Sequence, residues 1–152
     1  MDKLTGLIAA VVVIGGIAAG YQLFGKSEAE VGHSMTPPDT SAIAEGDPIV
    51  EVKLPAELSA QASLGKNVFE AKCVECHGTN AAGRSGMAPP LVHKIYEPSH
   101  HSDMAFIMAA QNGVRAHHWN FGNMPRIEGL TEGDVKMVAA YVRELQRANG
   151  IN

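Results

Sequence analysis

Cysteine is scarce in this chain of 152 residues, which has only Cys73 and Cys76, within the sequence CVECH at 73–77. A structural zinc site takes four ligands, usually from two such pairs, and the chain has no second pair. A thioredoxin-like dithiol would begin a helix after a strand, whereas this pair follows a predicted helix. A disulfide across so short a loop would add little stability. All three explanations of the pair are therefore weak.

Aromatic residues are also few, at 5% of the chain, although apolar residues make up 45%. Much of the Ala, Val and Ile lies in the segment Leu4–Gly25, and the remainder is small and fairly polar. A domain built from that remainder would have a thin hydrophobic core unless something else fills it. A large apolar cofactor would be one such filler.

An excess of positive charge is absent, since 12 Lys and Arg face 16 Asp and Glu and the net charge is −4. We expect no nucleic-acid partner. Residues 61–152 alone carry nine basic and eight acidic side chains, so their net charge predicts no strong electrostatic steering of a partner.

Charged residues are missing altogether from the 22 residues Leu4–Gly25. As a helix this segment would be about 33 Å long, which matches a bilayer core of about 30 Å. A cleaved signal peptide is the alternative, but its apolar region usually spans only about 7–15 residues. We therefore predict that residues 1–25 form an N-terminal membrane anchor, with 4–25 in the lipid bilayer.

Residues 26–58 differ sharply from the anchor in composition. Seven acidic residues oppose Lys26 and Lys53, which gives a net charge of −5, and four prolines interrupt the segment (Pro37, Pro38, Pro48 and Pro55). A segment with so little apolar surface and no helical periodicity is typical of an extended chain. We predict a flexible acidic linker that tethers a folded domain, residues 59–152.

The folded domain is predicted to be all-α. The stretch 59–72 reads as a helix with Ser59 as its N-cap and with Leu64, Val68 and Phe69 on its inner side. A stronger helix is predicted within 130–150, where Thr131 and Asp134 form a capping box before a stripe of Val135, Val138, Val142 and Leu145. The middle is rich in Gly, Pro, His and Met, with one short helical candidate at 102–113. A middle segment of this composition is expected if it surrounds a bound group.

A histidine directly after the cysteine pair completes the haem-attachment pattern Cys-x-x-Cys-His. Two thiols must reach the two vinyl groups on one porphyrin edge, and the next residue must place its imidazole under the iron. Cys73 and Cys76 suit the first task and His77 suits the second. We predict one covalently attached haem c.

From about Ser59 to Asn149 the chain resembles the class I c-type cytochromes, of the single-haem bacterial kind. The matching segments are CVECH, APPL at 88–91, NMP at 123–125 and the terminal VAAYVRELQ. The resemblance implies a cytochrome c fold around the haem, with the Pro89 carbonyl accepting a hydrogen bond from the second nitrogen of His77. It also implies a crossing of the first and last helices, at Gly65 and Phe69 against Val138 and Tyr141. Ala88 departs from the glycine that is usual in the family.

An electron carrier needs a second strong axial ligand, and five methionines follow the haem motif. Met137 lies within the last helix, and Met104 and Met108 share one face of the short helix, so packing explains all three better. Met87 is too near His77 in sequence to reach the opposite face easily. Met124 lies in a loop before Pro125, as in the family, and we predict His77/Met124 ligation, which raises the redox potential.

Histidine is the competing ligand type. His117 and His118 lie just upstream of Met124, and His100 and His101 form a second pair. They could instead be exposed, or one of His117, Trp119 and Arg115 could hydrogen-bond a haem propionate. A second metal site made from the two pairs is a further hypothesis, which has no support from ligand spacing.

Three functions are consistent with these features. The first is a membrane-tethered periplasmic electron carrier, not an enzyme, that takes electrons from a quinol-oxidising complex or a dehydrogenase and passes them to a terminal oxidase or reductase. The resemblance implies this orientation, because haem attachment in the family occurs outside the bacterial inner membrane. The second is a fixed electron-transfer subunit of a larger complex. The third is a haem sensor or peroxidase-like enzyme with an open iron, which the histidine pairs alone favour.

Overall fold

The computed structural model of the chain describes residues 34–152, so the predicted anchor at 4–25 lies outside the described residues. Within 34–152 the regular structure is helical, and only two isolated β-bridges occur, Arg84 with Ala88 and Val114 with Met124. No helix in this range is long and apolar enough to cross a membrane. The all-α prediction is confirmed for these residues.

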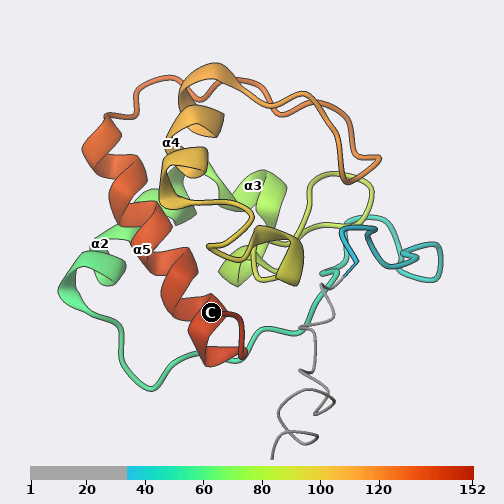
Figure 1. Cartoon of the computed structure of the whole chain (residues 1–152), viewed down its shortest axis with the longest axis horizontal. Helices are drawn as coiled ribbons and strands as arrows, with labels where there is room; N and C mark the ends of the chain where they lie inside the picture. Colours follow the sequence, from blue (N-terminus) through green and yellow to red (C-terminus); the bar gives the residue numbers. More distant parts are fainter. Residues whose placement is uncertain (1–33) are drawn as a thin grey trace, which may run out of the picture. The chain divides into compact units, whose positions relative to one another are not determined.

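Four α-helices and two short 3₁₀ turns make up this part of the chain (Figure 1). They are α2 (Ala60–Lys72), α3 (Val74–His77), η1 (Thr79–Ala81), η2 (Lys94–Tyr96), α4 (Asp103–Asn112) and α5 (Glu132–Ala148). Long loops join them, and the loop from α4 to α5 arches over one side of the domain (Figure 1).

Both terminal helices begin at the predicted caps. The Ser59 hydroxyl accepts a hydrogen bond from the Ala62 amide at 3.2 Å, at the start of α2. The Thr131 hydroxyl accepts one from the Asp134 amide at 3.1 Å, and the Asp134 carboxylate accepts the Thr131 amide at 2.8 Å. These bonds satisfy amide groups that have no partner within the first helical turn.

The crossing of α2 and α5 forms the core. The ring of Phe69 meets the ring of Tyr141 edge-on, with centroids 5.7 Å apart, and both side chains are buried. Gly65 lies directly against the backbone of α5, where a Cβ would stand 1.8 Å from the Met137 carbonyl oxygen. Only glycine allows the two helices to approach so closely. The crossing that the resemblance implied is present at Gly65, Phe69 and Tyr141.

The predicted apolar faces are correct for α5 and partly wrong for α2. Val135, Val138, Val142 and Leu145 are all buried. Leu64 was expected on the inner side of its helix, but it is 55% exposed. The buried face of α2 consists of Ala62, Gly65 and Phe69, and Leu64 lies off that face.

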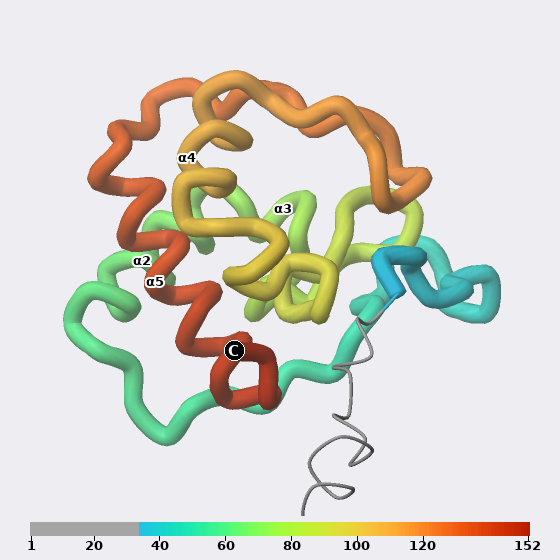
Figure 2. The backbone as a smooth tube through the Cα atoms, viewed as in Figure 1, coloured from blue at the N-terminus to red at the C-terminus, as the bar shows by residue number. Residues whose placement is uncertain are grey.

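Residues 34–58 differ from the predicted flexible linker. They contain no helix or strand, but the amides of Ile49 and Val50 both donate to the Ala82 carbonyl at 3.1 Å. The Lys53 amide and carbonyl both bond the Asn149 side chain, each at 2.9 Å. The tube in Figure 2 follows this segment past the C-terminal end of α5. Backbone hydrogen bonds hold this segment although its composition predicts little burial, so the folded part begins before Ser59.

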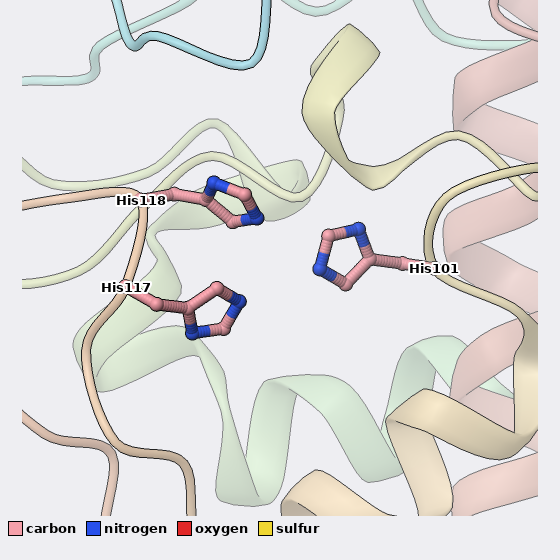
Figure 3. Close-up of side chains that lie close together, drawn as sticks. All are labelled: His101, His117 and His118. Atoms are coloured by element: carbon pink, nitrogen blue, oxygen red, sulfur yellow. The ribbon is translucent and has the colours of Figure 1, made fainter.

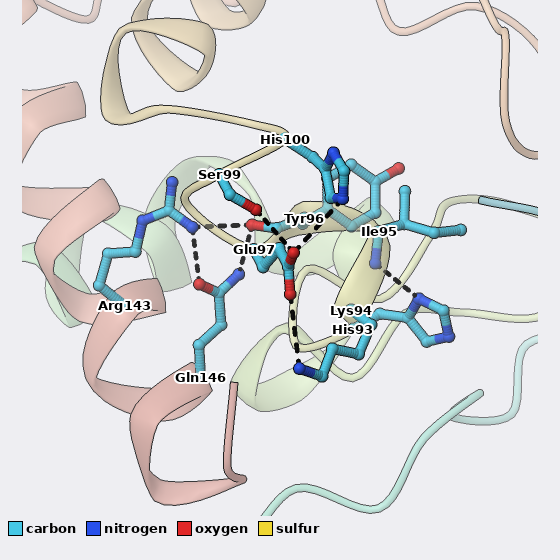
Figure 4. A network of polar contacts seen from close by, with 9 residues as sticks. All are labelled: His93, Lys94, Ile95, Tyr96, Glu97, Ser99, His100, Arg143 and Gln146. Atoms are coloured by element: carbon cyan, nitrogen blue, oxygen red, sulfur yellow. Dashed lines mark hydrogen bonds and ion pairs between the residues drawn. The ribbon is translucent and has the colours of Figure 1, made fainter. Parts of the chain in front are cut away.

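A polar network ties α5 to the loop that precedes α4 (Figure 4). The buried Arg143 guanidinium donates to the Tyr96 carbonyl at 2.7 Å and to the His101 carbonyl, and it pairs with Asp103 at 2.8 Å. Gln146, also fully buried, donates to the Tyr96 carbonyl at 2.9 Å and to the Leu91 carbonyl at 2.8 Å. These side chains satisfy carbonyls that no regular structure pairs, and they fix the path of the loop.

The same loop carries a buried carboxylate, Glu97 (Figure 4). The Ser99 hydroxyl donates to it at 2.6 Å, Lys94 lies at 3.5 Å, and the His100 Nε2 at 3.3 Å. A buried carboxylate is stable only when donors surround it, so this cluster holds residues 94–100 in one conformation.

Candidate functional site: an apolar cavity with two thiols and a buried imidazole

The cysteine pair lies at the junction of α2 and α3. The Cys73 amide donates to the Phe69 carbonyl at 2.8 Å, and the His77 amide donates to the Cys73 carbonyl at 2.9 Å. This single extra turn brings Cys73, Cys76 and His77 to the wall of one cavity. The turn ends at Gly78, whose φ of +72° and close contact with the Gly83 carbonyl suit only glycine.

Both thiols are free in the described structure. Burial, followed by the neighbouring Cys76, raises the pKa of the Cys73 thiol to about 11. A redox dithiol of the thioredoxin type needs the opposite shift, because the thiolate is the reactive form. The geometry and the pKa therefore argue together against a redox-active dithiol.

His77 is buried and oriented by a backbone carbonyl. Its Nδ1 lies 2.9 Å from the Pro89 oxygen, the contact that the resemblance implies. Burial lowers the pKa of His77 more than this hydrogen bond raises it, so the neutral ring is favoured. With Nδ1–H donating to Pro89, Nε2 keeps the lone pair that a metal ion takes.

The turn that presents Pro89 accommodates Ala88 without strain. The Arg84 amide donates to the Ala88 carbonyl at 2.9 Å, and the Ala88 amide returns a bond to Arg84 at 3.1 Å. Ala88 is buried and is not among the described residues with positive φ. The conformation here does not require the glycine that is usual in the family.

Met124 also lines the cavity. A two-residue bridge holds it, since the amides of Val114 and Met124 donate to each other's carbonyls at 2.9 and 3.0 Å. Gly113 allows this approach, because a Cβ there would stand 2.6 Å from the Met124 carbonyl oxygen. Pro125 follows and cannot extend the bridge, so Met124 is held at a defined point in the loop.

The other methionines are less suited to ligation. Met87 and Met108 line the cavity too, but they are 45% and 51% exposed. Met104 and Met137 are not part of the cavity wall. Met124 is therefore the methionine that both lines the cavity and has its backbone held by hydrogen bonds.

The cavity fits a large apolar group that carries a few polar atoms. Its volume is about 570 Å³, within the usual range for ligand sites, and its walls are mostly apolar. The indole Nε1 of Trp119 is buried there and hydrogen-bonds no residue of the described range, although the Tyr96 hydroxyl lies near it. A buried donor left unpaired costs about 1–3 kcal/mol. A carboxylate of a bound group, such as a haem propionate, would satisfy it.

Of the other residues that the sequence analysis named as candidates, some line the cavity and some do not. Trp119 and His117 reach the cavity, whereas Arg115 is exposed and is not part of its wall. His101 and His118 line the cavity, and His100 pairs with Glu97 instead. Tyr96 is a cavity residue that the sequence analysis missed, and no motif in the sequence marks it.

An all-α domain whose apolar cavity presents two free thiols and a buried, oriented imidazole has the features of a covalent haem protein. Comparison with known proteins identifies the family. Residues 62–146 match the model of the family described as Cytochrome c, and the chain belongs to that family. Its cofactor is covalently bound haem c with iron, and the chain is a c-type haem electron-transfer protein.

Among curated proteins the chain is similar to the "Cbb3-type cytochrome c oxidase subunit FixP" of Bradyrhizobium sp. (strain ORS 278). The two are 36% identical over 94 residues, which cover 60% of this chain and 30% of the relative. The chain thus spans less than a third of the length of that relative.

Proposed function

We propose that this protein is a membrane-tethered periplasmic electron carrier that shuttles single electrons between respiratory or photosynthetic membrane complexes. One observation carries the proposal: His77 and Met124 line the same apolar cavity. An iron held by both has no open position for a substrate. The protein would then carry electrons without catalysing a reaction of its own.

Each site residue has a distinct role in this proposal. Cys73 and Cys76 would hold the haem through thioether bonds, and His77 would bind its iron through Nε2. The Pro89 carbonyl fixes the orientation of the His77 ring and makes it a stronger ligand. Met124 would offer its thioether sulfur to the iron, a ligand that favours the reduced state.

When bound, haem iron supplies the exchange of one electron between the ferrous and ferric states. The chain limits what else can happen at the site. The apolar walls exclude water, and a protein environment of low polarity is one of the levers that set the potential. The two backbone hydrogen bonds between Val114 and Met124 hold the backbone at Met124 in place.

The proposed anchor is the apolar segment 4–25, with the haem domain in the periplasm of a bacterium. A tether raises the effective concentration of partner complexes in the same membrane. The donor would be a quinol-oxidising complex or a dehydrogenase, and the acceptor a terminal oxidase or reductase. A short-lived redox contact of this kind needs only a small interface.

A fixed subunit of an oxidase complex is the second candidate. It is favoured by the similarity to a protein named as a subunit of a cbb3-type oxidase. The matched residues cover only 30% of that relative. The similarity therefore supports a shared haem domain but does not by itself support membership of the same kind of complex.

Two experiments test the proposal. The reduced, haem-loaded protein is exposed to carbon monoxide, and an iron closed by two protein ligands should leave the spectrum unchanged. Rapid binding would contradict the carrier and favour a sensor or an enzyme. Native membranes are then dissolved in mild detergent and fractionated by size. A carrier should separate from the oxidase, whereas a fixed subunit should migrate with it.

A further inference from the structure

Three histidines from two separate loops point toward one another (Figure 3), and all three line the cavity. His101 precedes α4, and His117 and His118 follow it in the loop that carries Met124. One ring nitrogen of each lies within 4.8 Å of the others. The rings of His117 and His118 are 4.3 Å apart between centroids, and His101 faces them at 6.1 and 5.4 Å.

Backbone carbonyls fix two of the three rings. The Nδ1 of His101 lies 2.6 Å from the Ile95 carbonyl oxygen, and the Nδ1 of His117 lies 2.9 Å from the Arg115 carbonyl oxygen. Each Nδ1–H is a donor in this arrangement, so Nε2 carries the lone pair. Metal-binding histidines show this same pattern, one nitrogen bonded to a carbonyl and the other on the ion.

The cluster favours neutral rings, which is the form that binds metal. Burial lowers the pKa of His101 most, and the nearby His117, His100 and Arg143 lower it further against the opposing Ile95 bond. Burial and the two neighbouring histidines likewise lower the pKa of His118, although a bond to the Met35 backbone raises it. Three imidazoles placed this close disfavour one another's protonation.

We propose that His101, His117 and His118 bind one divalent transition-metal ion of the zinc or copper class, at a site separate from the haem iron. Three imidazoles with no carboxylate suit Zn²⁺ and Cu²⁺ and do not suit Mg²⁺ or Ca²⁺. The inference does not rest on the electron-carrier role.

Only a small closure of the cluster is needed. Metal–nitrogen bonds of about 2.0–2.1 Å in tetrahedral geometry put ligand nitrogens about 3.3 Å apart. From the observed limit of 4.8 Å, each ring has to move by less than about 1 Å. Small rotations about the side-chain bonds are sufficient for a movement of this size, and His117 and His118 are exposed and half-buried. Solvent can supply the fourth ligand, since the site lies at the exposed edge of the cavity.

Such an ion would link the loop before α4 to the loop after it. Arg143 already fixes the His101 carbonyl to α5. His117 and His118 belong to the loop that the Val114–Met124 bridge closes. The ion would therefore join the loop of the candidate axial methionine to the part of the domain that α5 holds. Metal binding should stabilise the fold and strengthen the hold on Met124.

The test uses the tag-free, haem-loaded full chain in detergent after treatment with a chelator. Zn²⁺ and Cu²⁺ are titrated in separately by calorimetry, and we expect one ion per chain. His117→Ala should weaken binding at least about tenfold, and His117→Ala with His118→Ala should abolish it. The matched control His100→Ala removes the adjacent histidine that is not part of the cluster and should bind as the parent does.

A second measurement needs no variant. The electron paramagnetic resonance spectrum of the Cu²⁺-loaded parent should show hyperfine splitting from imidazole nitrogens. The proposal is overturned by the absence of one-to-one binding, or by equal binding in His117→Ala and the parent. It is also overturned if His117→Ala shifts the haem potential while no ion binds the parent, since the rings would then serve the propionates.

Discussion

Gly65 in α2 lies against the Met137 backbone in α5 so closely that a Cβ would stand 1.8 Å from the Met137 carbonyl oxygen. Gly65→Ala must therefore push the two helices apart at the centre of the core. We expect the free energy of unfolding to fall by about 1–3 kcal/mol, the usual cost of overpacking, and more if the Phe69–Tyr141 contact opens.

Urea denaturation of the haem-loaded protein measures this change. Gly133→Ala is the matched control, because Gly133 is helical, exposed and has only the Thr131 hydroxyl at 3.6 Å from an added Cβ. That control should be neutral or slightly stabilising. Equal stability of Gly65→Ala and Gly133→Ala would show that the helices do not cross as described.

Local sequence patterns were sufficient to predict the two terminal helices, α2 and α5. Ser59 and the Thr131–Asp134 pair mark both starts, and the stripe on α5 follows helical periodicity. Leu64 was misplaced because the face of α2 that packs is centred on the small residues Ala62 and Gly65 with Phe69, which an apolar pattern does not mark. The packing of residues 34–58 was also missed, because it depends on hydrogen bonds to distant backbone groups.

The residues of the candidate site also divide into those that the sequence alone could identify and those that it could not. CVECH is a contiguous motif, so Cys73, Cys76 and His77 could be identified without a structure. The histidine cluster could not, because His101 joins His117 and His118 only through the folding of two loops. Its metal-binding hypothesis had no spacing evidence in the sequence, and the structure supplies the distances.

Arg143 should contribute far more to stability than its ion-pair partner. Arg143→Ala removes the side-chain donor of the His101 carbonyl and one of the two donors of the Tyr96 carbonyl, which keeps its bond from Gln146. We expect a loss of about 1–3 kcal/mol, the cost of leaving a buried polar group without its partner. Asp103→Ala should cost less than about 1 kcal/mol, because Asp103 is 67% exposed and surface ion pairs are weak. Thermal unfolding of the two variants compares them, and a larger loss in Asp103→Ala would contradict the assignment.

The capping box of α5 should make stability depend on pH in the acid range. Hydrogen bonds from the Thr131 side chain, then from its backbone, hold the pKa of Asp134 below 3.8. Because the folded pKa is below the unfolded one, the stabilisation is complete above the unfolded pKa and is lost as pH falls through the folded pKa.

Asp134→Asn should therefore be less stable than the parent near neutral pH, and the two should converge as the pH falls through the lowered pKa of Asp134. Urea midpoints measured from about pH 6 to about pH 3 follow the difference. Glu128→Gln removes an exposed carboxylate outside the helix and should track the parent throughout. A constant gap between Asp134→Asn and the parent would rule out linkage through this carboxylate.

Covalent haem attachment should require the two cysteines. Replacing Cys73 and Cys76 together by alanine removes both thioether bonds, and acidified organic solvent should then extract the haem. The Cys76→Ala variant should retain haem through one bond, with a visible spectrum shifted by the unsaturated vinyl group that is left. Haem that stays on the chain in the double variant during denaturing electrophoresis would exclude attachment at these residues.

Met124 is the ligand assignment on which the electron-carrier proposal depends. A methionine sulfur on ferric haem gives a weak red absorption band, so the oxidised parent should show it and Met124→Ala should lack it. The potential should fall in the variant, because loss of the thioether removes a ligand that favours ferrous iron. Met108→Ala is the matched control, since Met108 lines the same cavity but is 51% exposed. If Met108→Ala loses the band and Met124→Ala keeps it, the ligand comes from α4. If the parent has no band, the second ligand is not methionine, and the adjacent histidines His117 and His118 become the candidates.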